Sequence, residues 1–182
     1  IGGGGGGGEG GVSGISSEGG SGTNSSIDLN TNPNVSTDRD QEFYDKHTWG
    51  SFEDMELKDN LLRGIYSFGF EVPSAIQQKA IVPFTDNHDL IAQAQSGTGK
   101  TATFAIGMLQ NLNEDLDKTQ AVILTHTREL ALQSYNVVSA LSKYMKIDIN
   151  LTIGGTNSRE NIDELNNNPH VVIGTPGRIL DM

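Results

Sequence analysis

The sequence contains no cysteine, which excludes disulfide bonds and thiolate metal sites within this chain. Near Ile1 there is no basic segment followed by an apolar one, so we predict no secretory signal. No apolar run approaches the roughly 20 residues that a helix needs to cross a bilayer. These absences fit a reducing compartment and predict that a membrane is not a partner.

Positive charge is scarce as well. The chain has 12 Lys and Arg residues against 23 Asp and Glu residues, which gives a net charge of −11. Proteins that grip nucleic acid by bulk electrostatics carry the opposite balance. A nucleic acid could therefore be bound only through a few well-placed contacts.

Composition divides the chain into two parts. Residues 1–48 hold 13 of the 23 glycines together with many Ser and Asn residues. Such a segment cannot bury enough apolar surface to offset its ordering entropy, so we predict a disordered acidic tail over 1–48. Residues 49–182 are predicted to form one globular domain. Because the sequence begins with Ile1 and stops at Asp181–Met182, we interpret the chain as a piece of a longer one.

Short runs rich in Val and Ile alternate with segments of helical periodicity in the globular part. We predict four strands, at 90–93, 121–124, 147–153 and 171–174. The predicted helices are 58–67, 74–84, 101–112, 129–144 and 159–167. Strands separated by helix-length segments indicate an α/β domain with a parallel sheet that is buried on both faces.

The segment from Ala94 to Thr101 matches the phosphate-loop pattern G-x-x-x-x-G-K-[ST], except that Ala94 replaces the first glycine. Gly97 and Gly99 allow the backbone to direct successive N–H groups at a phosphate, and the following helix adds the positive end of its dipole. Lys100 would reach the β- and γ-phosphates, and the Thr101 hydroxyl would bind Mg²⁺. The alternative is an ordinary glycine turn between a strand and a helix.

A second pattern lies upstream, at Gly69 to Gln78. Ser74 after Pro73 is a good N-cap, which places Gln77 in the first turn of the next helix. An amide both donates and accepts, so Gln77 could bond the amino group and N7 of adenine. Phe52 lies 17 residues before Gly69. By itself, a Gln on an early helical turn is usually only solvated, and a lone Phe before a helix is more often a core residue.

Three further segments suit the binding of a nucleic-acid backbone. Thr127 and Arg128 follow the second predicted strand, where Thr127 can cap a helix and both side chains can face a phosphate. Gly154–Gly155 would allow a close backbone approach, and the segment 175–178 follows the last strand. An ordinary capped helix start and an ordinary glycine turn are the alternatives here.

Together, in this order and spacing, these motifs resemble those of the DEAD-box RNA helicase family. The resemblance implies a RecA-like phosphate-loop domain, incomplete at its C-terminal end, from about Ser51 to Met182. It departs from the family pattern at Thr125–His126, where the family usually has Ala-Pro. Within the family, sequence segments such as Leu61 to Tyr66 are similar to those of the translation initiation factor 4A group. A relative of the exon-junction type is the alternative.

The resemblance also assigns roles. It implies that the chain binds ATP and Mg²⁺ and that Phe52 stacks on the adenine. The residues implied to bind the nucleotide are Phe52, Gln77, Gln95, Ser96, Gly97, Thr98, Gly99, Lys100 and Thr101. Of these, Lys100 and Thr101 are the predicted catalytic residues, and Thr101 is the metal ligand. It implies RNA contacts by Thr127, Arg128, Gly154, Gly155, Thr175, Pro176, Gly177 and Arg178.

The implied partners are single-stranded or short duplex RNA and a translation initiation scaffold protein, bound by a cytoplasmic or nuclear monomer. The Asp-Glu-Ala-Asp tetrad of the family is not among the 182 residues. We therefore expect this chain alone to be inactive in ATP hydrolysis. A binding protein without catalysis and a phosphate-loop small-molecule kinase are the competing functions, and the Gln77 and Thr175–Arg178 segments argue against the kinase.

Overall fold

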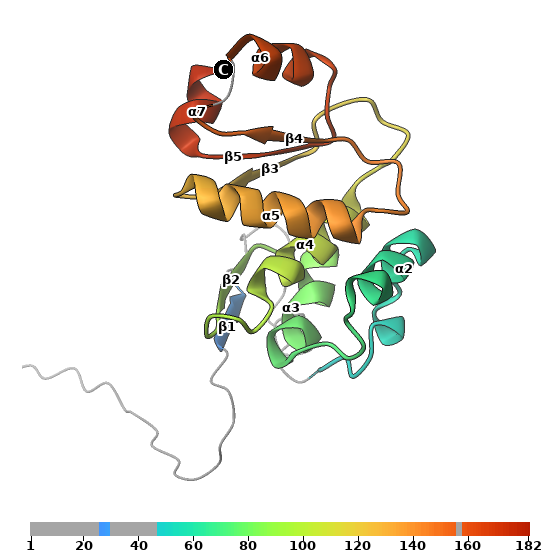
Figure 1. Cartoon of the computed structure of the whole chain (residues 1–182). Coiled ribbons are helices and arrows are strands. Elements are labelled where there is room, and N and C mark those ends of the chain that lie inside the picture. The colour runs from blue at the N-terminus through green and yellow to red at the C-terminus, as the bar shows by residue number, and fades with distance from the viewer. Residues whose placement is uncertain (1–25, 30–46, 156–157) are drawn as a thin grey trace, which may run out of the picture.

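The computed structural model of this chain describes residues 26–29, 47–155 and 158–182. The elements in chain order, shown in Figure 1, are β1 (Ser26–Leu29), η1 (Glu53–Met55), α2 (Asp59–Phe68), α3 (Ala75–Thr85), β2 (Leu90–Gln93), α4 (Lys100–Asn111), β3 (Ala121–Leu124), α5 (Arg128–Leu141), β4 (Ile149–Thr152), α6 (Ser158–Asn166), β5 (Val171–Gly174) and α7 (Pro176–Asp181).

The predicted elements are confirmed in type and order. Three of the four predicted strands have the predicted bounds, and the strand predicted at 147–153 is shorter, at Ile149–Thr152. The helix predicted at 129–144 ends at Leu141, where the Ser142 N–H closes the last turn on the Val138 carbonyl. A parallel sheet flanked by helices, as the α/β pattern indicated, is formed by β3, β5 and β4 in that spatial order.

Helices cover both faces of this parallel sheet. Figure 1 shows α5 along one face and α6 with α7 along the other. The central strand β5 is buried along its whole length, because it pairs with β3 on one side and β4 on the other. Burial on both faces explains why its sequence, Val171 to Gly174, is continuously apolar.

Strand β2 does not belong to this sheet. It pairs with β1 in a separate antiparallel pair, with Ser26 opposite Gln93 and Leu29 opposite Leu90. The parallel sheet that the sequence indicated therefore does not include β2. Composition did not predict β1 either, although Ser26–Leu29 alternates polar and apolar residues as strands do. The rest of the predicted tail, apart from 47–48, lies outside the described residues.

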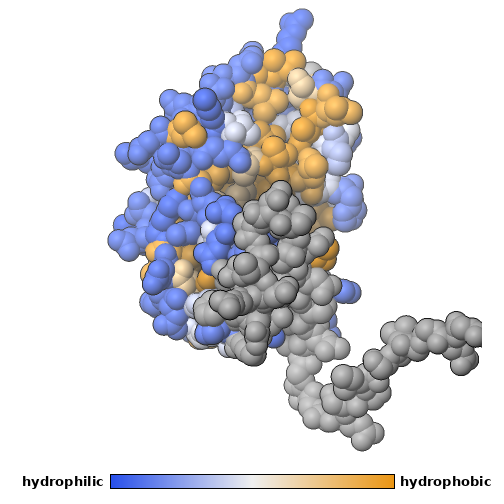
Figure 2. Space-filling view, turned by 180° about the vertical axis from the view of Figure 1, so that it is seen from behind, coloured by the Kyte–Doolittle hydropathy of each residue, from blue (hydrophilic) through white to orange (hydrophobic). Residues whose placement is uncertain are grey.

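One apolar core connects the helices near the β1–β2 pair with those of the parallel sheet. Buried side chains of α4 (Ile106, Leu109) and of α5 (Ala131, Val138) belong to one apolar cluster. Helix α2 packs on the far end of α5, where Gly64 meets the backbone of Leu141. Figure 2, seen from behind, shows apolar side chains gathered at the surface of the molecule as well. None of the described helices is long and apolar enough to cross a membrane.

The close contact of Gly64 with Leu141 can be tested by adding a side chain at position 64. A Cβ at this position would lie 1.9 Å from the Leu141 carbonyl oxygen, so alanine forces α2 away from α5. We expect Gly64→Ala to lower the free energy of unfolding by about 1–3 kcal/mol, the usual cost of overpacking. Gly50→Ala is the matched control, because a Cβ there meets nothing within 4 Å.

Urea denaturation followed by circular dichroism measures both variants. Gly50→Ala should stay within about 0.5 kcal/mol of the original chain. An unfolding free energy of Gly64→Ala equal to or above that of the original chain would contradict the close packing of α2 on α5.

Candidate nucleotide and RNA site

The loop between β2 and α4 has the backbone of a phosphate-binding loop. Gly97 and Gly99 adopt φ values of +80° and +93°, which side-chain-bearing residues rarely do. Gly99 is the N-cap of α4, so the first helical N–H groups are not used inside the helix. Gly97 and Gly99, the two glycines of this loop, therefore stand where the backbone requires glycine.

Lys100, the first residue of α4, folds back over this loop. Its ammonium group donates to the carbonyl oxygens of Ala94 and Gln95, the latter at 2.7 Å. The Thr98 hydroxyl donates to the same Gln95 carbonyl at 2.7 Å. These bonds fold the loop around the Lys100 ammonium group, so that its positive charge lies beside the loop carbonyls.

The Ser74–Gln77 segment is in direct contact with this loop. The Ser74 N–H donates to Gln77 Oε1 at 2.8 Å in a capping box that starts α3, and the Ser74 hydroxyl donates to the Thr98 carbonyl at 2.8 Å. A Cβ on Gly99 would lie 2.8 Å from Gln77 Nε2. Two motifs about 20 residues apart in the sequence thus form one site, in which Gln77 is 2% exposed.

Phe52 does not lie open to a ligand. It is 0% exposed, with its ring 6.4 Å from that of Tyr66 and 6.5 Å from that of Phe70. In this conformation no face of the Phe52 ring is open to an adenine base, so the stacking of Phe52 on adenine stays a prediction. The apolar neighbourhood of Leu57, Leu61 and Ile65 buries the ring fully, as in the core-residue alternative.

Thr101 is the one metal ligand that the sequence suggested. It is half-buried at the start of α4. No group of three or more His, Asp or Glu side chains that could hold a metal ion occurs among the described residues. A metal at Thr101 would thus take its other ligands from phosphate oxygens and water, as Mg²⁺ commonly does.

The other predicted segments meet at one edge of the parallel sheet. The registers align Leu124 and Thr152 with Gly174, so β3, β4 and β5 end together. Thr125, Ile153 and Thr175 are therefore the first residues beyond the same edge. This register brings together the segments at 127–128, 154–155 and 175–178, which the sequence could only suggest separately.

Thr127 acts as the helix cap that its position suggested. Its hydroxyl accepts a hydrogen bond from the Leu130 N–H at 3.2 Å. The hydroxyl of Thr125 donates to the Thr127 carbonyl at 3.0 Å and braces this turn. The sequence alone did not predict this bond, although Thr125 is a visible departure from the usual alanine of the motif.

Arg128 lies against the glycine pair. A Cβ on Gly154 would be 2.9 Å from one terminal nitrogen of the Arg128 guanidinium, and a Cβ on Gly155 would be 3.1 Å from the other. Arg128 itself is exposed. The pair thus provides a bare backbone surface on which the guanidinium rests, with its outer side facing solvent.

The segment 175–178 completes this edge. Thr175 is the N-cap of α7, Pro176 occupies its first turn, and a Cβ on Gly177 would meet nothing within 4 Å. Arg178 is 13% exposed and forms an ion pair with Asp181 at 3.3 Å. Arg178 is therefore less available to a new anionic partner than Arg128.

The structure thus contains a loop with two positive-φ glycines in contact with a buried Gln77, and an exposed Arg128 at the carboxyl ends of the parallel strands. The sequence profile of the family described as DEAD/DEAH box helicase matches residues 74–182. The chain belongs to this family, and the predicted recognition is confirmed.

Relatives within the family carry a more particular name. The chain is 59% identical over 132 residues to "ATP-dependent RNA helicase eIF4A" of Mycosarcoma maydis, covering 72% of this chain and 32% of that protein. It is 56% identical over 134 residues to "Eukaryotic initiation factor 4A" of Drosophila melanogaster, covering 74% and 33%. The chain thus spans about a third of the length of these relatives.

Solved structures agree with the fold. A DEAD box protein from Methanococcus jannaschii superposes with a TM-score of 0.67 at 38% identity, covering 74% of this chain and 37% of that one. Dbp5 of S. cerevisiae, solved bound to RNA and ADP BeF3, gives a TM-score of 0.63 at 35% identity, covering 73% and 34%. The predicted RecA-like α/β class is confirmed by these neighbours.

The resting place of Arg128 can be tested without a ligand. In Gly154→Ala the new methyl group would displace the guanidinium, which is the mobile end of a flexible side chain. We expect the Nε–Hε NMR resonance of Arg128 to shift while the thermal midpoint changes by less than about 2 °C. Gly177→Ala, where a Cβ meets nothing within 4 Å, is the control and should leave that resonance in place. An unmoved Arg128 resonance in Gly154→Ala would show that the guanidinium does not rest on the glycine pair.

Proposed function

We propose that this chain is the ATP-binding part of an ATP-dependent RNA helicase of the initiation factor 4A type. The observation that carries the proposal is the contact between two motifs, in which Gln77 lies against Gly99 and the Ser74 hydroxyl bonds the Thr98 carbonyl. A phosphate loop alone would fit many nucleotide-binding enzymes. The braced Gln beside it adds a group with the donor and acceptor that adenine recognition needs.

The nucleotide phosphates are held by main-chain N–H groups of the loop and of the start of α4. Residues 95–101 supply these donors, and the dipole of α4 favours the negative charge. Lys100 exchanges its carbonyl partners, Ala94 and Gln95, for the β- and γ-phosphates. Its charge is thus already at the loop before a nucleotide arrives, held by neutral groups that it can leave.

Gln77 and Phe52 serve the adenine in different ways. Gln77 Nε2 faces the loop, and its Oε1 keeps one lone pair beyond the bond from Ser74. Because Phe52 is buried, its part in this proposal is indirect. It supports the ring of Phe70, in the segment that leads into Ser74.

Mg²⁺ would be held by the Thr101 hydroxyl, by phosphate oxygens and by water. When bound, the ion would neutralise the charge that develops on the transferred phosphoryl group. The 182 residues contain no Asp-Glu-Ala-Asp tetrad to position the ion and a water. We therefore expect the chain by itself to bind nucleotide and not to hydrolyse it.

RNA is contacted through its backbone at the shared sheet edge. Arg128 offers a solvent-facing guanidinium, whose planar fork suits a phosphate. Gly154, Gly155 and the 175–178 segment add bare backbone and N–H groups. These contacts read no bases, so the RNA bound, single-stranded or in a short duplex, is selected by shape and not by sequence.

The proposed partner protein, place of action and oligomeric state rest on the relatives alone. A translation initiation scaffold protein as a partner, a cytoplasmic place of action and a monomeric state are part of this proposal. A purely binding role is the second candidate. ATP hydrolysis by a longer form that carries these residues would decide for the enzyme.

Lys100→Met tests the nucleotide site. The substitution keeps an unbranched apolar stem of similar length and removes the charge that meets the phosphates. Loss of a charge-assisted hydrogen bond costs about 1.5–3 kcal/mol, so we expect ATP affinity to fall at least about tenfold. Titration with a fluorescent ATP analogue in the presence of Mg²⁺ measures the affinity.

Lys79→Met is the matched control, because Lys79 is an exposed residue of α3 outside the predicted motifs. Its affinity for ATP should equal that of the original chain. Unchanged ATP binding by Lys100→Met, with the fold intact by circular dichroism, would refute the assignment of this loop as the phosphate site.

A further inference from the structure

Strand β4 forms one end of the parallel sheet, and its outer edge is open. The N–H of Val171 donates to the Asp148 carbonyl, and the N–H of Thr175 donates to the Thr152 carbonyl. In a parallel ladder this register directs the main chain of Asn150 toward β5 and that of Ile149 and Leu151 toward the outer edge. Within the described part of the chain, no further strand pairs there.

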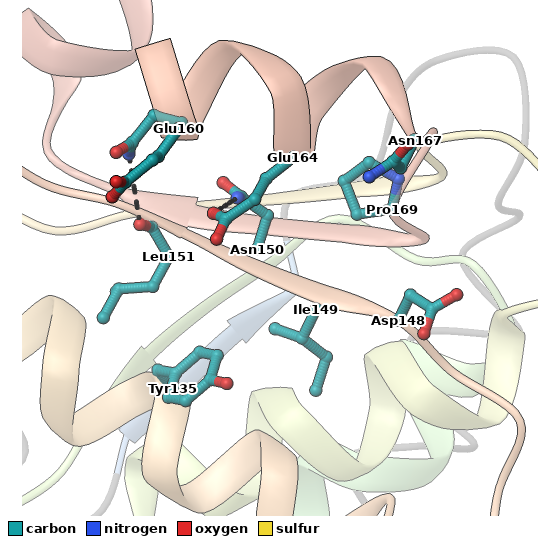
Figure 3. A pocket seen from close by; sticks show the side chains of 10 residues that line it. Tyr135, Asp148, Ile149, Asn150, Leu151, Glu160, Glu164, Asn167 and Pro169 are labelled. Carbon is teal, nitrogen blue, oxygen red and sulfur yellow. Dashed lines mark hydrogen bonds between the residues drawn. The ribbon is translucent and has the colours of Figure 1, made fainter. Parts of the chain in front are cut away.

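A cavity of about 610 Å³ runs along this edge. Figure 3 shows it bounded by α6 on one side and by α5 on the other, with β4 as its floor. Ten residues line it: Tyr135, Asp148, Ile149, Asn150, Leu151, Glu160, Asn161, Glu164, Asn167 and Pro169. The space thus lies where an added strand would run.

The two sides of the cavity differ in chemistry. On the side of α6, Glu160 and Glu164 are exposed, and Asn150 donates to Glu164 at 2.8 Å. On the side of α5, the half-buried side chains of Ile149, Leu151 and Tyr135 pack against the core. Figure 3 shows this division, with Asn150 near Glu164 and Ile149 pointing toward α5. One wall is therefore acidic and the other apolar.

The charge at this cavity has one sign. Asp148, Glu160 and Glu164 are carboxylates, and none of the ten lining residues is Lys or Arg. The Leu151 carbonyl already accepts from Asn161 Nδ2 at 3.5 Å, which leaves the Leu151 N–H and both main-chain groups of Ile149 directed outward. An occupant must therefore offer positive charge and an extended backbone together.

We infer that this cavity binds an extended, basic segment of a partner protein, which adds to β4 as a further strand. Side chains alternate across a strand, so the segment carries Lys or Arg at the positions that face α6 and apolar residues at the positions that face α5. At about 3.3 Å per residue, the four residues of β4 match a segment of roughly four to six residues. This interaction goes beyond the proposed function and does not depend on it.

Other occupants fit less well. A nucleic acid would bring its phosphates against three carboxylates. A second copy of this chain, paired through its own β4, would place the same acidic residues opposite one another, and each copy has a net charge of −11. A basic peptide meets neither repulsion.

Peptides with blocked main-chain donors provide the first test. The probe is a fluorescein-labelled ten-residue peptide with a centre of alternating Lys and Val, and anisotropy measures its binding to the full 182-residue chain. Two versions carry N-methyl groups, one on the Lys residues and the other on the Val residues. Only one of these sets points its N–H groups at β4 in the bound strand.

We expect one methylated peptide to lose binding and the other to retain it within about twofold, since only the edge-facing hydrogen bonds are lost. Equal loss or equal retention by both peptides would overturn strand addition. No binding of the unmodified peptide at about 1 mM, a concentration that reports even weak sites, would overturn the proposal as a whole.

The acidic wall is tested with the double variant Glu160→Gln and Glu164→Gln. Gln at 164 keeps an oxygen for Asn150, so the strand should remain in place. The loss of two exposed ion pairs predicts about tenfold weaker binding at low salt. The control is Glu56→Gln with Glu71→Gln, two exposed acids outside the cavity, and it should bind as the original chain does.

Circular dichroism serves to check that both variants are folded. Equal affinity of the two variants would overturn the role of the acidic wall. A peptide with Glu in place of Lys that binds as well as the original would overturn it too. Dimerisation of the chain that depends on Ile149, measured by sedimentation, would assign the edge to a second copy and contradict the proposal.

Discussion

The packing of α4 against α5 holds this domain together, because no hydrogen-bonded strand pair connects β2 with β3. Ile106 and Leu109 of α4 and Ala131 and Val138 of α5 are fully buried in one cluster. Each of these helices begins directly after a site-forming turn, α4 at Lys100 and α5 at Arg128. The contact between the helices therefore fixes the loop before α4 and the turn before α5 relative to each other.

Both proposed sites use the same physical device. A strand ends, a short turn exposes main-chain N–H groups, and a helix starts with a basic residue near its positive end. Glycines supply the bare backbone at Gly99 and at Gly154, and in both places a side chain from another segment rests on it, Gln77 in one case and Arg128 in the other. Under the proposed function both turns would receive phosphate groups, one set from ATP and the other from RNA.

Local elements were predictable because their signals are local. The strand Val171–Gly174 is a short apolar run, and the start of α3 follows from Ser74 and Gln77 as a capping box. Contacts between distant segments carry no such signal. The sequence shows Arg128 and Gly154 but not that they touch, and it shows an isolated Phe52 but not the apolar cluster that buries it. The pairing of β2 with β1 escaped for the same reason, since composition marked the whole segment 1–48 as unstructured.

Amide hydrogen exchange of the chain, measured with and without ATP–Mg²⁺ and with and without a single-stranded oligouridine, tests the central assignment most directly. The account predicts that ATP slows exchange at residues 95–101. It predicts that RNA slows exchange at 127–128, 153–155 and 175–178. Protection by either ligand confined to other segments, such as α2 or the start of α6, would contradict the account.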